Sequence, residues 1–269
     1  MSDTYFIDTG ETDKQRLTIL SALYNPPALR FLKNNGLKPG MTVLEVGCGT
    51  GHMSCDLATC VGDGGRVIAI DKSAEQVAIA KNTAQERGIS NIEFIVHDVL
   101  KMDDLNLNCD FTYGRWVLEF LPHPEEAFEV LFRALNPGGV LAYEACNIKQ
   151  SNVFSLPHDP VIEQWHCYGP ALFKHFNCPL EFAYDDVYPI LLALGLEEID
   201  VHVNQAVLKT ATEKSVYRLG LLSIMSALIE NKIATRQDID KQIAQLITLE
   251  NSRTVTGFFH NLLLCGKKP

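Results

Sequence analysis

Three glycines, Gly47, Gly49 and Gly51, stand at G-x-G-x-G spacing directly after a short apolar segment, residues 41–46. A glycine loop between a strand and a helix lets the backbone approach a ligand closely, and the first N–H groups of the helix can hold a negatively charged group there. The fingerprint of nicotinamide and flavin dinucleotide sites is G-x-G-x-x-G, which is one residue longer before its third glycine. The loop therefore predicts a site for an adenine-bearing ligand but does not by itself select the ligand.

An aspartate follows each of the next two apolar segments. Asp71 ends the segment at residues 67–71, and Asp98 comes after residues 92–96. A carboxylate in the position of Asp71 can accept both hydroxyls of a ribose and disfavours a 2′-phosphate. Asp98 would lie in the crevice where open α/β sheets bind ligands and could accept a hydrogen bond from the amine of adenine. Without the glycine loop, these residues would be typical of a helix cap and a turn.

Alternating strands and helices position these groups. The sequence predicts a doubly wound, mostly parallel α/β sheet of seven strands, because near-continuous apolar strands alternate with amphipathic helices. An Asn-Pro-Gly-Gly turn is expected at residues 136–139, and a helix break is expected at Pro26-Pro27. The predicted strands are residues 41–46, 67–70, 92–96, 111–113, 140–145, 197–203 and 256–265, and the predicted helices are 13–34, 52–60, 73–87, 124–135, 188–194, 212–230 and 236–250.

The second half of the chain departs from this regular alternation. Residues 148–183 are rich in aromatics and histidines, and residues 204–253 hold two helical patterns where a short hairpin would suffice. Long ordered insertions near the carboxyl edge of a sheet are more often functional than idle. We therefore expect both to form a lid. The predicted domains are an N-terminal helical arm at 1–35, a cofactor-binding core at 36–147, and the rest of the core with its lid insertions at 148–269.

Composition excludes several classes of protein. The net charge of −10 and the absence of a Lys/Arg cluster argue against a nucleic-acid partner, which needs a basic face. The longest apolar stretch, residues 219–229, is too short for a membrane span, and the N-terminus lacks a signal-peptide pattern. The eight cysteines contain no C-x-x-C pair, so we expect no metal site and buried thiols in a reducing, cytoplasmic compartment.

The motifs together resemble those of the class I S-adenosylmethionine-dependent methyltransferases. The similarity covers about residues 36–146, with E-V-G-C-G-T-G at 45–51, acids after the second and third strands, F-T-Y-G-R-W-V-L-E-F-L-P at 111–122 and L-N-P-G-G-V-L at 135–141. The flanks are similar to a small-molecule subgroup with an N-terminal Arg-Leu helix and extra C-terminal helices. The resemblance implies a Rossmann-like fold, S-adenosylmethionine as cofactor, and a small-molecule substrate.

The resemblance also implies a role for individual residues. Glu45 to Gly51 would surround the methionine part of the cofactor, Asp71 would hold the ribose, Asp98 and Val99 the adenine, and Arg115 would lie beside the methionine end. Tyr5 and Arg16 would close over that end as part of the N-terminal arm. The predicted cofactor residues are Tyr5, Arg16, Glu45, Val46, Gly47, Cys48, Gly49, Gly51, Met53, Asp71, Lys72, Asp98, Val99 and Arg115.

Two other enzyme classes are disfavoured by missing motifs. No tyrosine of the chain has a lysine four positions later, so the Tyr-x-x-x-Lys pair of short-chain dehydrogenases is absent. Asn25-Pro26-Pro27 is similar to the N-P-P-Y signature of amino-group methyltransferases. However, that signature belongs after the fourth strand, and here it precedes the first and is followed by Ala28. We therefore interpret it as a helix break.

The sequence does not assign a catalytic residue. Methyl transfer from a sulfonium is an in-line displacement that needs alignment and a dry site, and it needs a base only if the acceptor must lose a proton. The candidates by residue type are Glu119, Glu144, His166 and His260. A cofactor-binding protein without turnover, or a partner subunit, is the alternative. The apolar stripe Leu219, Leu222, Met225 and Leu228 predicts packing of the lid on the body or, alternatively, a homodimer contact.

Overall fold

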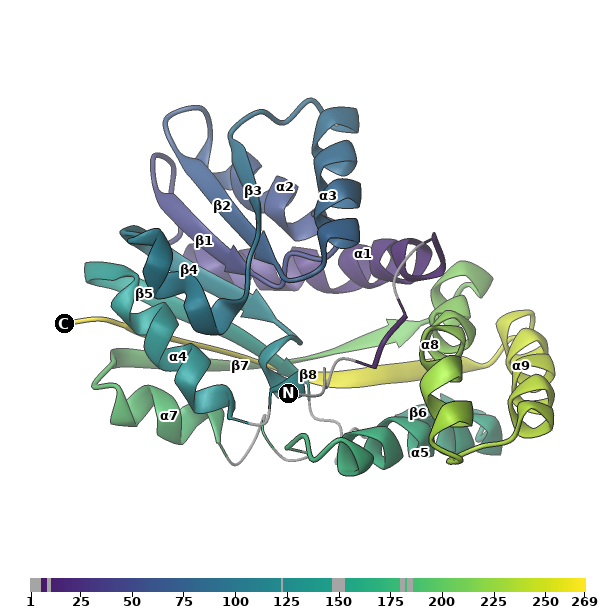
Figure 1. Cartoon of the computed structure of the whole chain (residues 1–269). Helices are drawn as coiled ribbons and strands as arrows, with labels where there is room; N and C mark the ends of the chain where they lie inside the picture. The colour runs from purple at the N-terminus through teal and green to yellow at the C-terminus, as the bar shows by residue number, and fades with distance from the viewer. Residues whose placement is uncertain (1–5, 9–10, 122, 147–152, 180–181, 183–185) are drawn as a thin grey trace.

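A mixed eight-stranded sheet forms the centre of the computed structural model, which describes residues 6–8, 11–121, 123–146, 153–179, 182 and 186–269. The order is β3-β2-β1-β4-β5-β8-β6, with β7 also paired to β8, and β8 runs antiparallel to β5, β6 and β7 (Figure 1). The strands are β1 (Thr42–Val46), β2 (Arg66–Asp71), β3 (Ile92–Val96), β4 (Cys109–Arg115), β5 (Leu135–Cys146), β6 (Phe154–Leu156), β7 (Glu197–Leu208) and β8 (Val255–Lys267). The doubly wound α/β fold is confirmed, but the sheet has eight strands and not the predicted seven, because the short β6 was not predicted.

Helices cover both faces of the sheet. Three of them, α1, α2 and α3, pack with one set of alternating strand residues, and α4 and α7 pack with the other set. Three more helices, α5, α8 and α9, lie at one end of the sheet (Figure 1). The helices are α1 (Glu11–Asn34), α2 (His52–Val61), α3 (Ala74–Glu86), α4 (Pro124–Arg133), α5 (Pro160–His175), α7 (Val187–Ala193), α8 (Ala211–Glu230) and α9 (Arg236–Glu250), with short 3₁₀ turns η1 (Val99–Leu105) and η2 (Leu118–Phe120).

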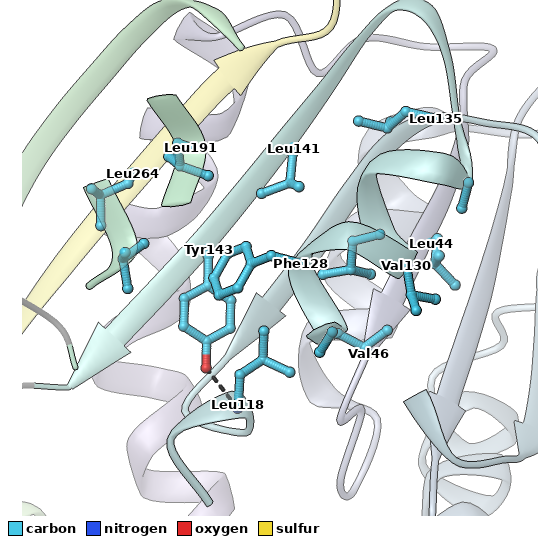
Figure 2. Packing of buried hydrophobic residues seen from close by; sticks show 14 of the residues in the cluster. Leu44, Val46, Leu118, Phe128, Val130, Leu135, Leu141, Tyr143, Leu191 and Leu264 are labelled. Carbon is cyan, nitrogen blue, oxygen red and sulfur yellow. Dashed lines mark hydrogen bonds between the residues drawn. The ribbon is translucent and has the colours of Figure 1, made fainter. Parts of the chain in front are cut away.

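Apolar side chains from β1, β4, β5 and α4 fill the core under α4 and α7. Figure 2 shows Leu44 and Val46 of β1 and Phe128 of α4 in this cluster, together with Tyr143 of β5. The hydroxyl of Tyr143 accepts the N–H of Leu118 at 2.8 Å, so even the polar atom of this buried ring has a partner (Figure 2). Because η2 follows β4 directly, this hydrogen bond fixes the chain at the carboxyl edge of the sheet.

Two local predictions are wrong. Pro26 and Pro27 lie inside α1, which runs without a break through both residues. Tyr24 and Ala28, on either side, are 1% and 0% exposed, so packing at both ends outweighs the hydrogen bonds that proline cannot donate. The predicted turn at 136–139 belongs to β5 as an irregularity in its pairing with β4.

A helical cap, defined here as β6, α5, α8 and α9, lies beyond the carboxyl end of β5. Cys146, the last residue of β5, pairs with Asn261 of β8, whereas β6 pairs with residues 255–257 further along β8. Helix α8 packs between α1, α5 and α9, and Leu219 and Leu228 of its apolar stripe are 5% and 0% exposed. The other two residues of the predicted stripe, Leu222 and Met225, are only half-buried, so the stripe packs within the chain in part, and the homodimer stays a prediction.

Within the ranges that the structure describes, no helix has both the length and the apolar character needed to cross a bilayer.

Candidate functional site

The glycine loop between β1 and α2 has a backbone that its glycines permit. Gly47, Gly49 and Gly51 have φ of 68°, 51° and 77°, a region that residues with a Cβ rarely adopt. A Cβ on Gly47 would lie 2.7 Å from Val117, and one on Gly51 would lie 2.8 Å from Ala80 of α3. Gly51 is also the N-cap of α2 and has no side chain to accept the first N–H groups of that helix. The loop can therefore offer backbone N–H groups to an anionic ligand.

Asp71, the last residue of β2, connects the glycine loop to the start of α3. Its Oδ2 accepts the N–H of Gly49 at 2.9 Å, and its Oδ1 accepts the N–H of Ser73 at 2.9 Å. Burial raises the pKa of Asp71, and these two N–H donors oppose that effect. The structure therefore brings Asp71 and the loop together, as the two sequence motifs predicted.

Arg115, at the end of β4, carries a buried donor without an acceptor. Its Nη2 donates to Asn25 Oδ1 of α1 at 2.7 Å. Its Nη1 has no hydrogen-bond partner among the described residues and lies 3.8 Å from Glu144 Oε2, which is too far for a hydrogen bond. A buried N–H without an acceptor is costly, and a guanidinium matches a carboxylate well. Arg115 therefore fits a site in which a ligand carboxylate supplies the missing acceptor.

Two buried glutamates lie near this guanidinium. Glu45 is 3% exposed and accepts the hydroxyl of Ser54 at 2.5 Å, and burial raises the pKa of Glu45 to about 7. Glu144 is 1% exposed and accepts hydrogen bonds from the Tyr113 hydroxyl at 3.0 Å and from Asn261 Nδ2 at 2.7 Å. Burial also raises the pKa of Glu144, and the charge of Arg115 opposes it. Both carboxylates are already hydrogen-bonded within the protein.

The N-terminal helix α1 reaches this site through Asp13 and Arg16. Asp13 is 1% exposed, accepts the Nε of Arg16 at 2.9 Å, and accepts Nε2 of Gln76 on α3 at 2.8 Å. The guanidinium of Arg16 is therefore engaged by a carboxylate of its own helix, and Asp13 ties α1 to α3. Leu17 of α1 lies beside Gly49 of the loop. Tyr5, the other predicted residue of this arm, lies outside the described residues.

The remaining predicted cofactor residues border the loop or follow β2 and β3. Val46 and Met53 are buried, at 1% and 3% exposure, and Cys48 donates its N–H to Ile70 O at 3.0 Å. Asp98 caps η1 by accepting the N–H of Leu100 at 3.1 Å. Lys72 and Val99 directly follow Asp71 and Asp98, and Lys72 is exposed.

The four candidate bases do not form one cluster. Glu119 lies in η2 and accepts hydrogen bonds from the Tyr143 hydroxyl at 2.5 Å and the N–H of Cys146 at 2.9 Å, which makes it a structural link between η2 and β5. His260 Nε2 pairs with Gln205 Oε1 at 3.1 Å. His166 of α5 is half-buried, and its Nδ1 is buried without a hydrogen-bond partner among the described residues. Glu144 lies beside Arg115, as described above.

Sequence reasoning missed two polar residues of the site and the conformation of one aromatic residue. Asn25 accepts from Arg115 and donates to Asp56 Oδ2 at 2.6 Å. Asn261 of β8 accepts the Nε1 of Trp116 at 2.8 Å. Trp116 itself has a φ of 53°, which is rare for a bulky residue and is typical of functional sites. In the sequence, the only sign that Trp116 belongs to the site was its position directly after Arg115.

No group of three or more possible metal ligands is found among the residues that the structure describes.

Comparison with known proteins gives matches over the same region. The methyltransferase domain family matches residues 37–191, which is more than half of the chain. Demethylmenaquinone methyltransferase of Lactococcus lactis is 28% identical over 131 residues, covering 49% of this chain and 52% of that protein. A 23S rRNA (uracil(1939)-C(5))-methyltransferase of Acinetobacter baylyi is 33% identical over 118 residues, covering 41% of this chain and 24% of that protein. The matched region thus spans about half or less of these curated relatives.

A solved structure agrees with the fold. The structure of an S-adenosylmethionine-dependent methyltransferase from Aquifex aeolicus superimposes with a TM-score of 0.51 and 25% identity, covering 75% of this chain and 93% of that one. The residues that match the family, 37–191, include β1 and its neighbours in the sheet, and with them the glycine loop and Asp71. The chain belongs to the methyltransferase domain family, and its fold and glycine loop are those of the class I enzymes that use S-adenosylmethionine.

Proposed function

We propose that the protein transfers a methyl group from S-adenosylmethionine to a small-molecule acceptor. The observation that carries the proposal is the buried Nη1 of Arg115, which has no hydrogen-bond acceptor among the described residues and lies at the carboxyl end of β4, next to β1 and its glycine loop. Cofactor binding would give this N–H group the carboxylate acceptor that it lacks. The cofactor supplies an electrophilic methyl group on a sulfonium.

The chain offers a group for each part of the cofactor. Asp71 would accept hydrogen bonds from the ribose hydroxyls, and Asp98 with Val99 would hold the adenine. Arg115 would bind the methionine carboxylate, and the backbone of residues 45–51 would surround the methionine. We propose that Arg16 contributes through Asp13 and Gln76, which hold α1 against α3, because its guanidinium is already engaged.

The cap supports a small acceptor. Helices α5, α8 and α9 pack together with α1 beyond the carboxyl end of β5, which favours an enclosed site over an open groove. The net charge of −10 disfavours a nucleic-acid acceptor. Among the relatives, demethylmenaquinone methyltransferase is named for a small molecule, whereas the uracil methyltransferase is named for ribosomal RNA, so the acceptor class needs a direct test.

The enzyme would act mainly by alignment. An acceptor held in line with the methyl carbon and the sulfur reacts without the entropy cost of a bimolecular encounter, and a dry site strengthens the attraction between the acceptor and the positive charge. The cap would exclude water, and Arg115 would fix the end of the cofactor nearest to the reacting sulfur.

Two measurements test the proposal. Calorimetry with S-adenosylmethionine, S-adenosylhomocysteine and NADH is expected to show binding of the first two and not of NADH. Incubation with methyl-labelled cofactor and fractionated cell extract is expected to place the label in the low-molecular-weight fraction. Label in RNA or protein would contradict a small acceptor, and binding without any labelled product would indicate a cofactor-binding protein without turnover. Tighter binding of NADH would overturn the cofactor.

A further inference from the structure

A bulge in β8 turns two neighbouring phenylalanines toward the cap. Gln205 of β7 pairs with His260 of β8, but Val207 pairs with Gly257, so Phe258 and Phe259 together face a single residue of β7. An inserted residue of this kind re-aims side chains that would otherwise alternate between the faces of the sheet. The two rings consequently lie 4.5 Å apart.

The two phenylalanines differ in surroundings. Phe258 is 3% exposed and packs on Trp165 and Tyr217 of the cap, with ring centroids at 5.6 and 5.2 Å. Phe259 is only half-buried, although it also lies 5.5 Å from Trp165. Its ring is 6.4 Å from that of Trp116. Phe258 is therefore a core residue, whereas Phe259 and Trp116 are only half-buried.

Trp116 is held firmly beside the proposed cofactor site. Its Nε1 donates to Asn261, its N–H donates to Glu144 O at 3.0 Å, and its ring meets that of Tyr24 edge-on at 4.8 Å. The guanidinium carbon of Arg115 lies 5.9 Å from the centre of the indole. The backbone and the indole of Trp116 are therefore both held in place, and its positive φ belongs to a class of backbone conformations that cluster at functional sites.

His166 places one polar atom near Phe259. Its ring centroid is 6.1 Å from that of Phe259. Its Nδ1 is buried without a hydrogen-bond partner among the described residues. Burial lowers the pKa of His166, so the imidazole is neutral at pH 7, and Nδ1 can accept a hydrogen bond when the proton is on Nε2.

We propose that Trp116 and Phe259 form the wall of an acceptor site for a flat aromatic molecule, and that His166 Nδ1 accepts the proton of its hydroxyl group. The inference rests on the proposed function, because Trp116 follows Arg115 directly. Flat rings are recognised by stacked or edge-on aromatic side chains, and a single polar atom then fixes their orientation. The substrate class is thus a phenol or naphthol.

The chemical step balances. As the O–H bond of the acceptor breaks, its proton passes to His166 Nδ1, and the electron pair left on the oxygen forms the new bond to the methyl carbon. The bond between this carbon and the sulfur breaks, and its electron pair stays on the sulfur. The products are the aryl methyl ether, neutral S-adenosylhomocysteine and a protonated imidazole, which then releases its proton to water.

Equilibrium dialysis of the full chain saturated with S-adenosylhomocysteine tests this assignment. The probes are 2-naphthol and 2-methylnaphthalene, which has similar shape but no hydroxyl. Wild-type protein is expected to bind 2-naphthol about fivefold to tenfold more tightly, the effect of one hydrogen bond. His166→Phe keeps a flat ring but has no acceptor, so it should remove this preference while leaving the affinity for 2-methylnaphthalene unchanged, and Trp116→Phe should weaken the binding of both probes. His175→Phe, on the exposed face of the same helix, is the matched control.

The outcomes separate the two proposals. If the wild type binds S-adenosylhomocysteine but shows no preference for 2-naphthol, the acceptor site is overturned and the proposed function stands. A preference that survives in His166→Phe would overturn the role of His166. If the wild type does not bind S-adenosylhomocysteine, the proposed function itself fails. Circular dichroism of each variant establishes that the fold is retained, and the preference for 2-naphthol in His175→Phe should equal that of the wild type.

Discussion

Asp71 accepts the backbone N–H of Gly49 at 2.9 Å, so the carboxylate that ends β2 also fixes the glycine loop that follows β1. A second N–H, from Ser73, occupies its other oxygen. One carboxylate thus sets the shape of the loop and the start of α3. Because an asparagine side chain has only one acceptor oxygen, it cannot replace both hydrogen bonds.

We expect Asp71→Asn to lower the affinity for S-adenosylhomocysteine by about tenfold or more, since the loop and the ribose lose an ionised acceptor. Calorimetry measures the change. The matched control is Asp63→Asn, because Asp63 is exposed in the loop between α2 and β2. Unchanged affinity in Asp71→Asn would remove Asp71 from the site.

Gly51→Ala tests the close packing of the glycine loop. Gly51 has a φ of 77°, and an added Cβ would lie 2.8 Å from Ala80. Gly88→Ala is a matched control, because Gly88 has a φ of 67° but nothing within 4 Å of the added carbon. Both variants should lose about 1–2 kcal/mol of unfolding free energy from backbone strain. Gly51→Ala should lose further unfolding free energy because of the contact with Ala80. Only this variant should also bind S-adenosylhomocysteine more weakly.

Urea denaturation and calorimetry give the two quantities. Equal losses in both glycine variants would mean that α3 yields to the new methyl group and that the contact with Ala80 is not restrictive. A weakened affinity in Gly88→Ala would show that global destabilisation, rather than the loop, controls cofactor binding.

Arg115→Lys tests the methionine end of the site. Lysine keeps the positive charge near Glu45 and Glu144, but it lacks the planar guanidinium. In arginine, one nitrogen of this group donates to Asn25 and the other, Nη1, is left for a ligand. We expect the affinity for S-adenosylhomocysteine to fall about tenfold to hundredfold. The affinity for 5′-methylthioadenosine, which has no carboxylate, should stay within about twofold. Equal losses for both ligands would make Arg115 a structural residue.

Local patterns were sufficient where local forces decide the structure. Helix α9 has the predicted bounds, 236–250, and begins at a capping box in which Thr235 Oγ1 accepts the N–H of Asp238 at 3.2 Å. The left-handed glycines of the loop were predictable because few other residues tolerate that conformation. The passage of α1 through Pro26 and Pro27 was not predictable, because burial of residues on both sides by distant elements overrides the local breaker.

The site was less predictable than the fold, because its partners are far apart in the chain. Arg115 and Asn25 are separated by 90 positions, and Trp116 and Asn261 by 145. The bulge at Phe258 and Phe259 depends on the register between β7 and β8. The alternation of side chains along each strand, which is what the sequence shows, does not reveal this register. Sequence motifs therefore predicted the groups that we propose for the cofactor, whereas the proposed aromatic wall required the three-dimensional structure.

Glu119 gives the stability of the protein a specific pH dependence. Its side chain is buried, and burial raises the pKa of Glu119 to about 7 from 4.5, although hydrogen bonds from Tyr143 and the N–H of Cys146 oppose the shift. Because the folded state binds this proton more tightly, the contribution of the group is fully present below about pH 4.5. It is lost as the pH rises through about 7.

Glu119→Gln removes the titrating proton and should flatten this dependence. The unfolding free energy of the wild type minus that of the variant is expected to fall by about 3 kcal/mol between pH 4.5 and 8, the value that corresponds to the shift in pKa. Urea denaturation at a series of pH values measures it. Glu86→Gln, at an exposed position of α3, should show no such trend. A difference that stays constant with pH would mean that Glu119 is ionised throughout and that its hydrogen bonds outweigh burial.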